Sequence, residues 1–348
     1  MSKMDFAAMD TKRRALYERM WGSDGFDFPV EKTEYRGSVS NNSYTFSGTS
    51  PEDPDVCSDG LIRLFGIQCP VRFKEKFKQS CSGSGQELKR IATVHSSSLC
   101  ALLFFYNVSE ENPYKMEIAG KEYIFTYSHF EYQNTVIEGR NPSNMDVVLI
   151  GEEKETGKPV VLFLESKFSE YYERPGKELE IKAAYLEDRY GAPLYNGDFW
   201  DKMGLCVQKR EGAATFVLRS TGDSCYLEGL KQMISHYIGV RKLCDAPEVK
   251  KDAVADAVAG GAKVLLGTIL FTEEIGQLPT GREGEKCFDS YRWRYRILAD
   301  ALNGQLEKDS QITVLQDILS YSDFRKKGFV WEPEIQRFYF GLRKGEAK

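Results

Sequence analysis

Hydrophobic and polar positions alternate most clearly between residues 144 and 167. Two apolar runs, Val147 to Ile150 and Val160 to Leu164, flank a polar loop from Glu152 to Lys158. This pattern predicts two β-strands joined by a turn. Both faces of each strand carry apolar side chains, so we expect the hairpin to lie inside a sheet that is covered on both sides.

The polar residues at one end of this hairpin are its most informative feature. A turn centred on Glu155 and Thr156 places Asp146 directly opposite Glu165 in an antiparallel pair. Because side chains alternate between the two faces, Asp146, Glu165 and Lys167 are predicted to emerge on one face. Burying such charges is costly unless they are paired or bind a metal. A structural ion pair between Lys167 and one carboxylate explains the pattern equally well.

Further strands are predicted on either side of the hairpin. Met116 to Phe125 has the pattern of a second hairpin, and Tyr127 to Ile137 is expected to continue as a strand beside that of Asp146. Lys263 to Phe271 is mostly apolar, which predicts a buried strand that completes the sheet.

Helices are predicted where apolar residues recur at helical spacing. Ser84 to Phe105 is one such stretch, and Ser84 with Glu87 forms a capping-box pattern at its start. Cys225 to Lys242 is a second stretch of this kind. Together with the strands, these helices predict an α/β fold.

Composition and charge narrow the range of functions. With 348 residues, 41% of them hydrophobic, the chain is long enough to bury a large core. It has no long apolar run and no signal-peptide pattern, so a cytoplasmic protein without a membrane partner is expected. Its eight cysteines form no CxxC or Cys/His cluster, which argues for reduced thiols and against a zinc site. A net charge of −5 does not favour a nucleic-acid partner, although a bound cation would offset acidic residues.

The pair of carboxylates and the lysine resemble a known motif. Asp146 and Glu165-Ser166-Lys167 are similar to the PD-(D/E)XK nuclease superfamily, which has an acidic residue on one strand and E-x-K on its hairpin partner. Asn144 and Met145 occupy the place of the loosely kept proline in that motif. The resemblance extends over about residues 84 to 271. It implies a restriction-endonuclease-like core, α-β-β-β-α-β, with a mixed central sheet flanked by helices.

On this basis the chain is expected to have a core with two extensions. Residues 1–80 would form an N-terminal extension packed on the core, and 81–275 the nuclease-like core with an insertion at about 168–224. Residues 276–348 would form a C-terminal helical extension, with helices at Phe288 to Leu302 and Gln311 to Tyr321.

Five more residues are candidates for accessory roles. The first core helix of the family often supplies a glutamate, which implicates Glu87, although helix capping explains it as well. Glu131 lies on the strand next to Asp146, where it is a candidate ligand or a cross-strand ion-pair partner. His95 follows Glu87 on the predicted helix, where a core histidine is the alternative. Gln232 and His236, one turn apart, partly match the Gln-then-aromatic pattern of the recombination-exonuclease branch, and a surface role is the alternative.

The resemblance implies a specific chemistry for the hairpin residues. Asp146, Glu165 and the backbone carbonyl of Ser166 would bind Mg²⁺ or Mn²⁺, which prefer oxygen ligands. Lys167 would orient the attacking water and stabilise charge on the phosphate. The hypothesis is a metal-dependent nuclease, endonuclease or exonuclease, with DNA favoured over RNA. A homodimer is also considered, because restriction-type nucleases often act as dimers.

Two other functions remain open. One is a catalytically inactive nucleic-acid-binding or interaction protein on the same fold, which the acidic net charge favours. The other is a sugar-directed hydrolase of unrelated fold that uses paired carboxylates as acid and base without a metal. That second alternative leaves Lys167 unexplained.

Overall fold

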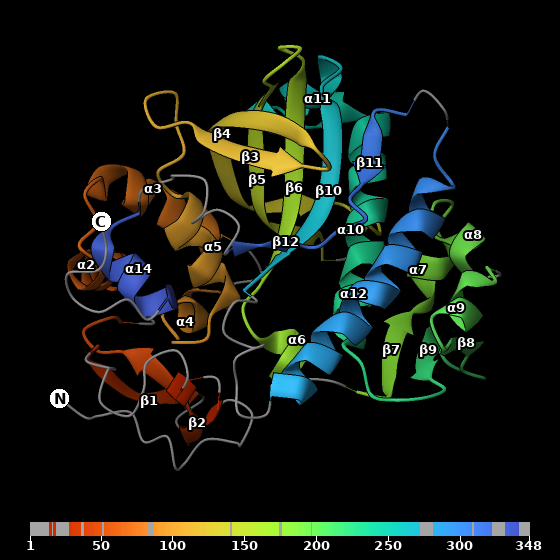
Figure 1. Cartoon of the computed structure of the whole chain (residues 1–348), viewed down its shortest axis with the longest axis horizontal. Coiled ribbons are helices and arrows are strands. Elements are labelled where there is room, and N and C mark those ends of the chain that lie inside the picture. The colour runs from red at the N-terminus through yellow and green to blue at the C-terminus, as the bar shows by residue number, and fades with distance from the viewer. Residues whose placement is uncertain are drawn as a thin grey trace.

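The computed structural model describes residues 14, 15, 17, 18, 28–35, 38–50, 52–82, 87–139, 141–173, 176–195, 197–271, 281–307, 310–321 and 331–340. Within these residues a mixed, curled β-sheet forms the centre of the molecule and helices flank it (Figure 1). The expectation of an α/β fold with a mixed central sheet is therefore confirmed. In the described part of the chain, no helix is long and apolar enough to cross a membrane.

Seven strands of the described chain make up the central sheet. Their order is β11-β10-β6-β5-β4-β3, and β12 also pairs with β10. β10 runs parallel to β6, β11 and β12, whereas β3 to β6 form antiparallel pairs. The strands are Tyr114–Ile118 (β3), Lys121–Asn134 (β4), Ser143–Glu153 (β5), Pro159–Lys167 (β6), Lys263–Leu270 (β10), Ile312–Val314 (β11) and Leu319–Ser320 (β12).

The central hairpin of β5 and β6 has the predicted register. Val147 pairs with Leu164, so the preceding residue Asp146 lies opposite Glu165. The turn contains Gly157, whose φ of 64° lies in the left-handed region that glycine adopts without steric cost. Period-two alternation and the turn residues together therefore fix which side chains share a face.

Helices cover both faces of the hairpin. On one face lies α5 (Ser97–Phe105), and on the other lie α10 (Leu227–Asp245) and α11 (Ala253–Ala259). The side chain of Ser166 on β6 donates to α5, whereas its neighbour Glu165 contacts α10. Since adjacent residues of a strand point to opposite faces, α10 lies on the face that carries the predicted site.

The helix predicted over Ser84 to Phe105 is interrupted. The structure has a short α4 (Glu87–Ile91) and then α5, and Ser96 caps α5 by accepting a backbone N–H at 3.0 Å. Between the two helices, Thr93 forms a β-bridge with the N-terminal strand β2 (Ser38–Phe46). The cap and this long-range bridge compete with a continuous helix. Ser84 lies outside the described residues.

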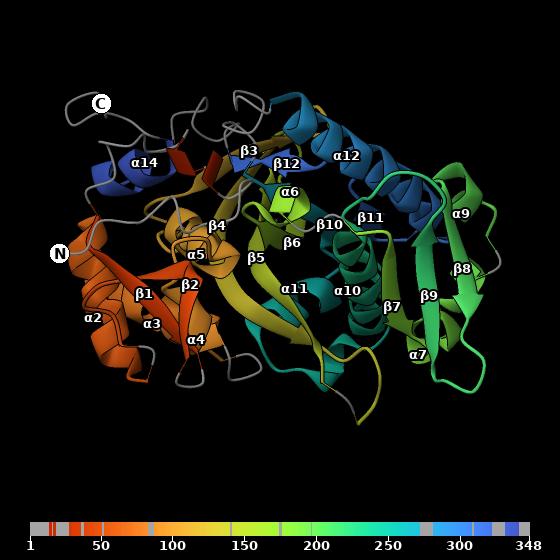
Figure 2. The same ribbon diagram turned by 90° about the horizontal axis from the view of Figure 1, so that it is seen from below.

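The N- and C-terminal elements lie together beside the core (Figures 1 and 2). Helix α14 packs against α2, and the rings of Phe46 and Phe338 are 5.3 Å apart. These elements include β1 (Val30–Tyr35), α2 (Pro54–Phe65), α3 (Pro70–Ser80) and α14 (Pro333–Phe340). Aromatic packing thus joins segments from opposite ends of the sequence.

Residues after β6 build a second, smaller sheet. Its strand order is β7-β9-β8, and every pair is antiparallel. Figure 1 shows it on the far side of α10 and α12 from the N-terminal elements. The elements are α6 (Glu170–Glu173), β7 (Glu178–Lys182), α7 (Ala183–Glu187), α8 (Ala192–Tyr195), α9 (Phe199–Lys202), β8 (Leu205–Lys209) and β9 (Thr215–Ser220).

The C-terminal region matches its sequence-based prediction only in part. The long helix α12 (Gly281–Asn303) covers the expected Phe288 to Leu302. The prediction of a helix over Gln311 to Tyr321 is wrong, because this segment forms β11 and β12 along the edge of β10. These strands have three and two residues, which is too short for a period-two pattern to be visible in the sequence.

Candidate functional site

Three acidic residues lie in one row across the central sheet. Asp146 on β5 is opposite Glu165 on β6, and the β4–β5 register places Glu131 opposite Asp146 from the other side. Glu131 has a φ of 49°, an uncommon conformation for a residue with a side chain. The carboxyl-bearing residues predicted on separate strands are therefore neighbours.

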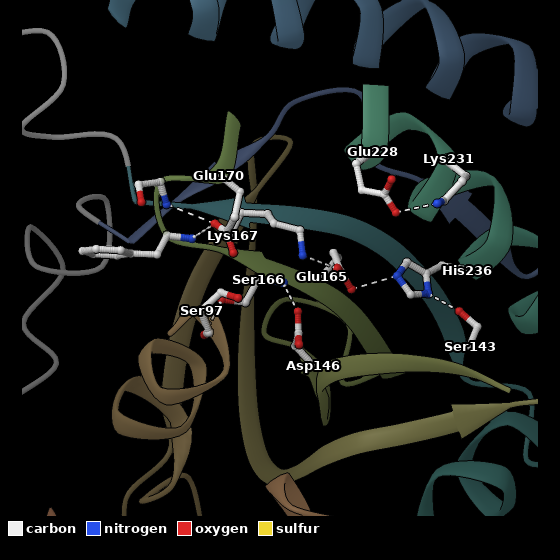
Figure 3. A network of polar contacts seen from close by, with 12 residues as sticks. Ser97, Ser143, Asp146, Glu165, Ser166, Lys167, Glu170, Glu228, Lys231 and His236 are labelled. Atoms are coloured by element: carbon white, nitrogen blue, oxygen red, sulfur yellow. Dashed lines mark hydrogen bonds and ion pairs between the residues drawn. The ribbon is translucent and has the colours of Figure 1, made fainter. Parts of the chain in front are cut away.

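Glu165 is held by two basic groups. Its Oε1 accepts a hydrogen bond from Lys167 Nζ, and its Oε2 lies 2.8 Å from His236 Nε2 (Figure 3). Glu165 and Lys167 are only 4% and 6% exposed. The structure thus brings together Glu165, Lys167 and His236, three of the residues predicted from the sequence.

Ser143 extends this network and was not predicted. Its Oγ lies 2.5 Å from Nδ1 of His236, so both ring nitrogens of that histidine have partners. Ser143 begins β5 and is buried. A serine near the start of a strand carries no sequence pattern that points to a histidine 93 positions away.

The pKa values of Asp146 and Glu165 are shifted in opposite directions. Burial and then the charge of Glu165 raise the pKa of Asp146 well above its usual value, and Glu131 adds to this rise. Lys167 and a hydrogen bond of 2.7 Å from the backbone N–H of Ser166 act in the opposite direction. The net effect is a raised pKa, so the protonated form of the Asp146 carboxyl is favoured more than in an ordinary aspartate.

Glu165 behaves differently because Lys167 and His236 lie against its carboxylate. Burial opposes its ionisation, but Lys167 and His236 lower its pKa to about 2. Burial likewise disfavours charge on Lys167, yet Glu165, with smaller contributions from Tyr226 and Asp146, raises the lysine pKa well above its usual value. The Glu165–Lys167 ion pair is therefore charged at neutral pH.

Ser166 divides its contacts between the two sheet faces. Its backbone N–H bonds Asp146, while its Oγ donates to Ser97 O at 3.0 Å and lies 2.7 Å from the Tyr321 hydroxyl. The side chain thus anchors β6 to α5 and to the C-terminal region. Its predicted role as a carbonyl ligand stays a prediction.

The first two accessory candidates, Glu87 and His95, precede α5 in the chain. Glu87 begins α4, and its side chain lies outside the described residues. His95 lies in the turn before α5 and is half-buried, so it does not occupy the helical stripe that the sequence predicted. Neither is among the residues labelled in Figure 3.

Two amide oxygens near the acidic row fit a ligand. Gln232 Oε1 and Asn144 Oδ1 are buried and have no hydrogen-bond partner within the described residues. Gln232 precedes His236 by one turn of α10, and Asn144 precedes Asp146 by two positions on the same face of β5. A buried acceptor without a donor is costly, and a hard cation or a donor on a ligand would satisfy both oxygens.

The carboxylates are not already gathered as a metal-binding group. Across the described residues, no three His, Cys, Asp or Glu side chains converge closely enough to hold an ion. The residues that fit Mg²⁺ or Mn²⁺ by their chemistry are Glu131, Asp146 and Glu165. In this arrangement the pKa of Asp146 is raised and Glu165 is paired with Lys167.

Comparison with known proteins gives no match. No protein-family model, no curated protein and no solved structure matches this chain. The interpretation of the site therefore depends on its geometry and its chemistry.

Proposed function

We propose that this protein is a metal-dependent nuclease that hydrolyses phosphodiester bonds, with DNA favoured as the substrate. The observation that carries this proposal is the row of Glu131, Asp146 and Glu165 across three neighbouring strands, in which burial and the charge of Glu165 raise the pKa of Asp146. A buried carboxyl beside another negative charge ionises less readily than one in water. A divalent metal bound there would favour the ionised form of Asp146, as metals do at sites whose ligands must be deprotonated.

The order of elements supports a restriction-endonuclease-like core. After α5 come the antiparallel strands β4, β5 and β6, then α10, and then β10 beside β6. This succession fits the α-β-β-β-α-β arrangement, with β3 as an added edge strand. The resemblance of Asp146, Glu165 and Lys167 to the PD-(D/E)XK motif supports the same function.

Each residue of the site has a role under this proposal. Asp146, Glu165 and the carbonyl of Ser166 would hold the metal, which when bound would polarise the phosphate and activate a water molecule. Lys167, a buried and charged ammonium, stabilises negative charge on the phosphate oxygens. His236, itself fixed by Ser143, holds the orientation of Glu165.

One observation favours a second function, a binding module without turnover. The polar groups of Glu165, Lys167 and His236 already satisfy one another, as in a structural ion-pair network. The sugar-directed hydrolase is less well supported, because it assigns no role to Lys167.

Calorimetry with Mg²⁺ and Mn²⁺ tests the proposal. We compare the intact protein with Asp146→Asn, and use Glu153→Gln as a control because it changes a carboxylate at the opposite end of β5. Titrations in two buffers of different ionisation enthalpy report proton release. We expect metal binding with proton release in the intact protein and the control, and neither in Asp146→Asn.

Cleavage of plasmid and single-stranded DNA is measured on the same preparations. Metal-dependent cleavage that is lost in Asp146→Asn and kept in Glu153→Gln supports the nuclease. If the intact protein binds neither metal, even with nucleic acid present, the network is structural and the binding module becomes the better hypothesis.

A further inference from the structure

A groove of about 460 Å³ opens beside the acidic row. It lies between the end of β4 and the segment that joins α10 to α11, where the 3-10 helix η2 (Pro247–Val249) is followed by two lysines. Its lining includes His129, Glu131, Gln133, Lys250 and Lys251. Because Glu131 belongs both to this groove and to the row with Asp146, the groove adjoins the candidate site at this residue.

The groove and the candidate site share one face of the sheet. His129 pairs with Val148, which is on the same face of β5 as Asp146. Tyr132, which also lines the groove, packs on Phe163, with ring centroids 6.0 Å apart. Phe163 shares its face with Glu165, two positions along β6. A ligand in the groove would therefore lie on the same face of the sheet as Asp146.

Positive charge is fixed at this groove. Lys250 Nζ donates to Gln133 O and lies 3.8 Å from the centroid of the Tyr132 ring, so its position is set by a hydrogen bond and a cation–π contact. Lys251, the next residue, is exposed. The two lysines therefore combine an anchored charge with one that is accessible to an anion.

The neighbouring acid, Asp252, is held in place by neutral donors. It accepts two contacts from the Tyr132 hydroxyl, at 3.1 and 3.2 Å, and also caps α11 through the backbone N–H groups of Val254 and Ala255. Its charge acts on Lys250, so the exposed Lys251 is the cation that is more available to an anion. The charge of Glu131 would be offset by the metal of the proposed function.

We propose that this groove binds a single DNA strand next to the phosphodiester that is cleaved, with Lys250 and Lys251 contacting its phosphates. This inference rests on the proposed nuclease function and adds the form of the substrate. A volume of about 460 Å³ accommodates a nucleotide of one strand. His129 and Gln133 supply the polar contacts to a base or sugar.

Fluorescence anisotropy with a labelled 12-nucleotide single strand tests the groove. Binding is measured for the intact protein, for Lys251→Glu and Lys251→Ala, and for Lys115→Glu as a control. Lys115 is exposed on β3 and pairs with Ile124, at the other end of β4 from Gln133. The titrations are made in EDTA and again in Ca²⁺, so that any need for a cation in binding is met.

We expect Lys251→Glu to weaken binding about tenfold or more and Lys251→Ala to weaken it less, while Lys115→Glu binds as the intact protein does. In the Lys251 variants, the slope of the logarithm of the binding constant against the logarithm of salt concentration should decrease in magnitude by about 0.7, because one phosphate contact is lost. A duplex of the same sequence should bind more weakly than the single strand. Three outcomes would contradict the proposal that the groove binds a single strand. These are equal effects at Lys251 and Lys115, no effect at either residue, and tighter binding of the duplex.

The two proposals fail in different ways. Single-strand binding that depends on Lys251, without metal-dependent cleavage, would reject the nuclease and retain the groove as a binding site. Cleavage that is lost in Asp146→Asn but unaffected by Lys251→Glu, with unchanged binding, would retain the nuclease and reject the groove.

Discussion

The central sheet and the smaller sheet β7-β9-β8 carry the same kinds of charged residues in opposite environments. In the central sheet, Glu165 and Lys167 are paired almost without exposure to solvent. In the smaller sheet, Arg219 Nε lies 2.6 Å from Glu178 Oε1, and about half of each side chain is exposed. The two pairs look alike in a sequence, yet desolvation makes only the first one costly.

This difference indicates where function is expected. Exposed pairs such as Arg219–Glu178 cost little to keep and need no special purpose. The buried pair lies near Asp146, a carboxyl whose pKa is raised by burial, and near two amide oxygens that lack partners within the described residues. Unfavourable features gathered at one place are typical of a binding or catalytic site.

Removing one member of the buried pair should have the largest effect on stability. Lys167→Met leaves Glu165 buried with His236 as its remaining partner, and we expect a loss of about 3–5 kcal/mol in the free energy of unfolding. Urea denaturation measures this loss. The double variant Glu165→Gln/Lys167→Met should recover part of it, because the uncompensated charge is gone. If Lys167→Met lowers the free energy of unfolding by less than the removal of an exposed ion pair does, the Glu165–Lys167 pair is not buried.

Asp146→Asn should have a smaller effect and the opposite sign. Folding raises the pKa of Asp146 above its ordinary 3.8, so the folded state binds the proton more tightly than the unfolded chain. Stability contributed by this group is therefore present at low pH and is lost as pH rises from about 3.8 towards the raised value. An amide resembles the protonated carboxyl and does not ionise.

We therefore expect Asp146→Asn to stabilise the metal-free protein at pH 7, by about 0.5–2 kcal/mol. The gain should shrink as pH approaches 4. Thermal unfolding across this pH range measures it. Added Mg²⁺ should raise the melting temperature of the intact protein and leave that of the variant unchanged. A variant less stable than the intact protein at pH 7 would show that Asp146 is ionised there.

Local sequence patterns predicted the central hairpin but not the contacts that its side chains make with α10. The register of Asp146 and Glu165 follows from period-two alternation and a short turn, and both are local properties of the sequence. Glu131 was placed on the correct neighbouring strand for the same reason. The contact between Glu165 and His236 depends on how α10 docks on the sheet, so the sequence supplied the candidate residue but not the contact.

Errors in the fold have the same origin. Thr93 pairs with an N-terminal strand, and this long-range bridge interrupts a stretch whose spacing is helical. The segment from Gln311 to Tyr321 becomes two short strands because β10 offers an open edge. In both places a tertiary contact outweighs local propensity.

The exposed pair should give the smallest effect and completes the comparison. Arg219→Ala removes a partner of Glu178 at a site where both side chains remain in contact with water, so we expect a loss of at most about 1 kcal/mol. Raising the salt concentration should diminish even this loss, because mobile ions screen exposed charges. The buried Glu165–Lys167 pair should respond much less to salt, since ions do not reach it. Urea denaturation of Arg219→Ala and Lys167→Met at low and high salt measures both responses. A strong salt response in Lys167→Met would mean that water enters the central site, and the contrast between the two sheets would then be one of geometry rather than of desolvation.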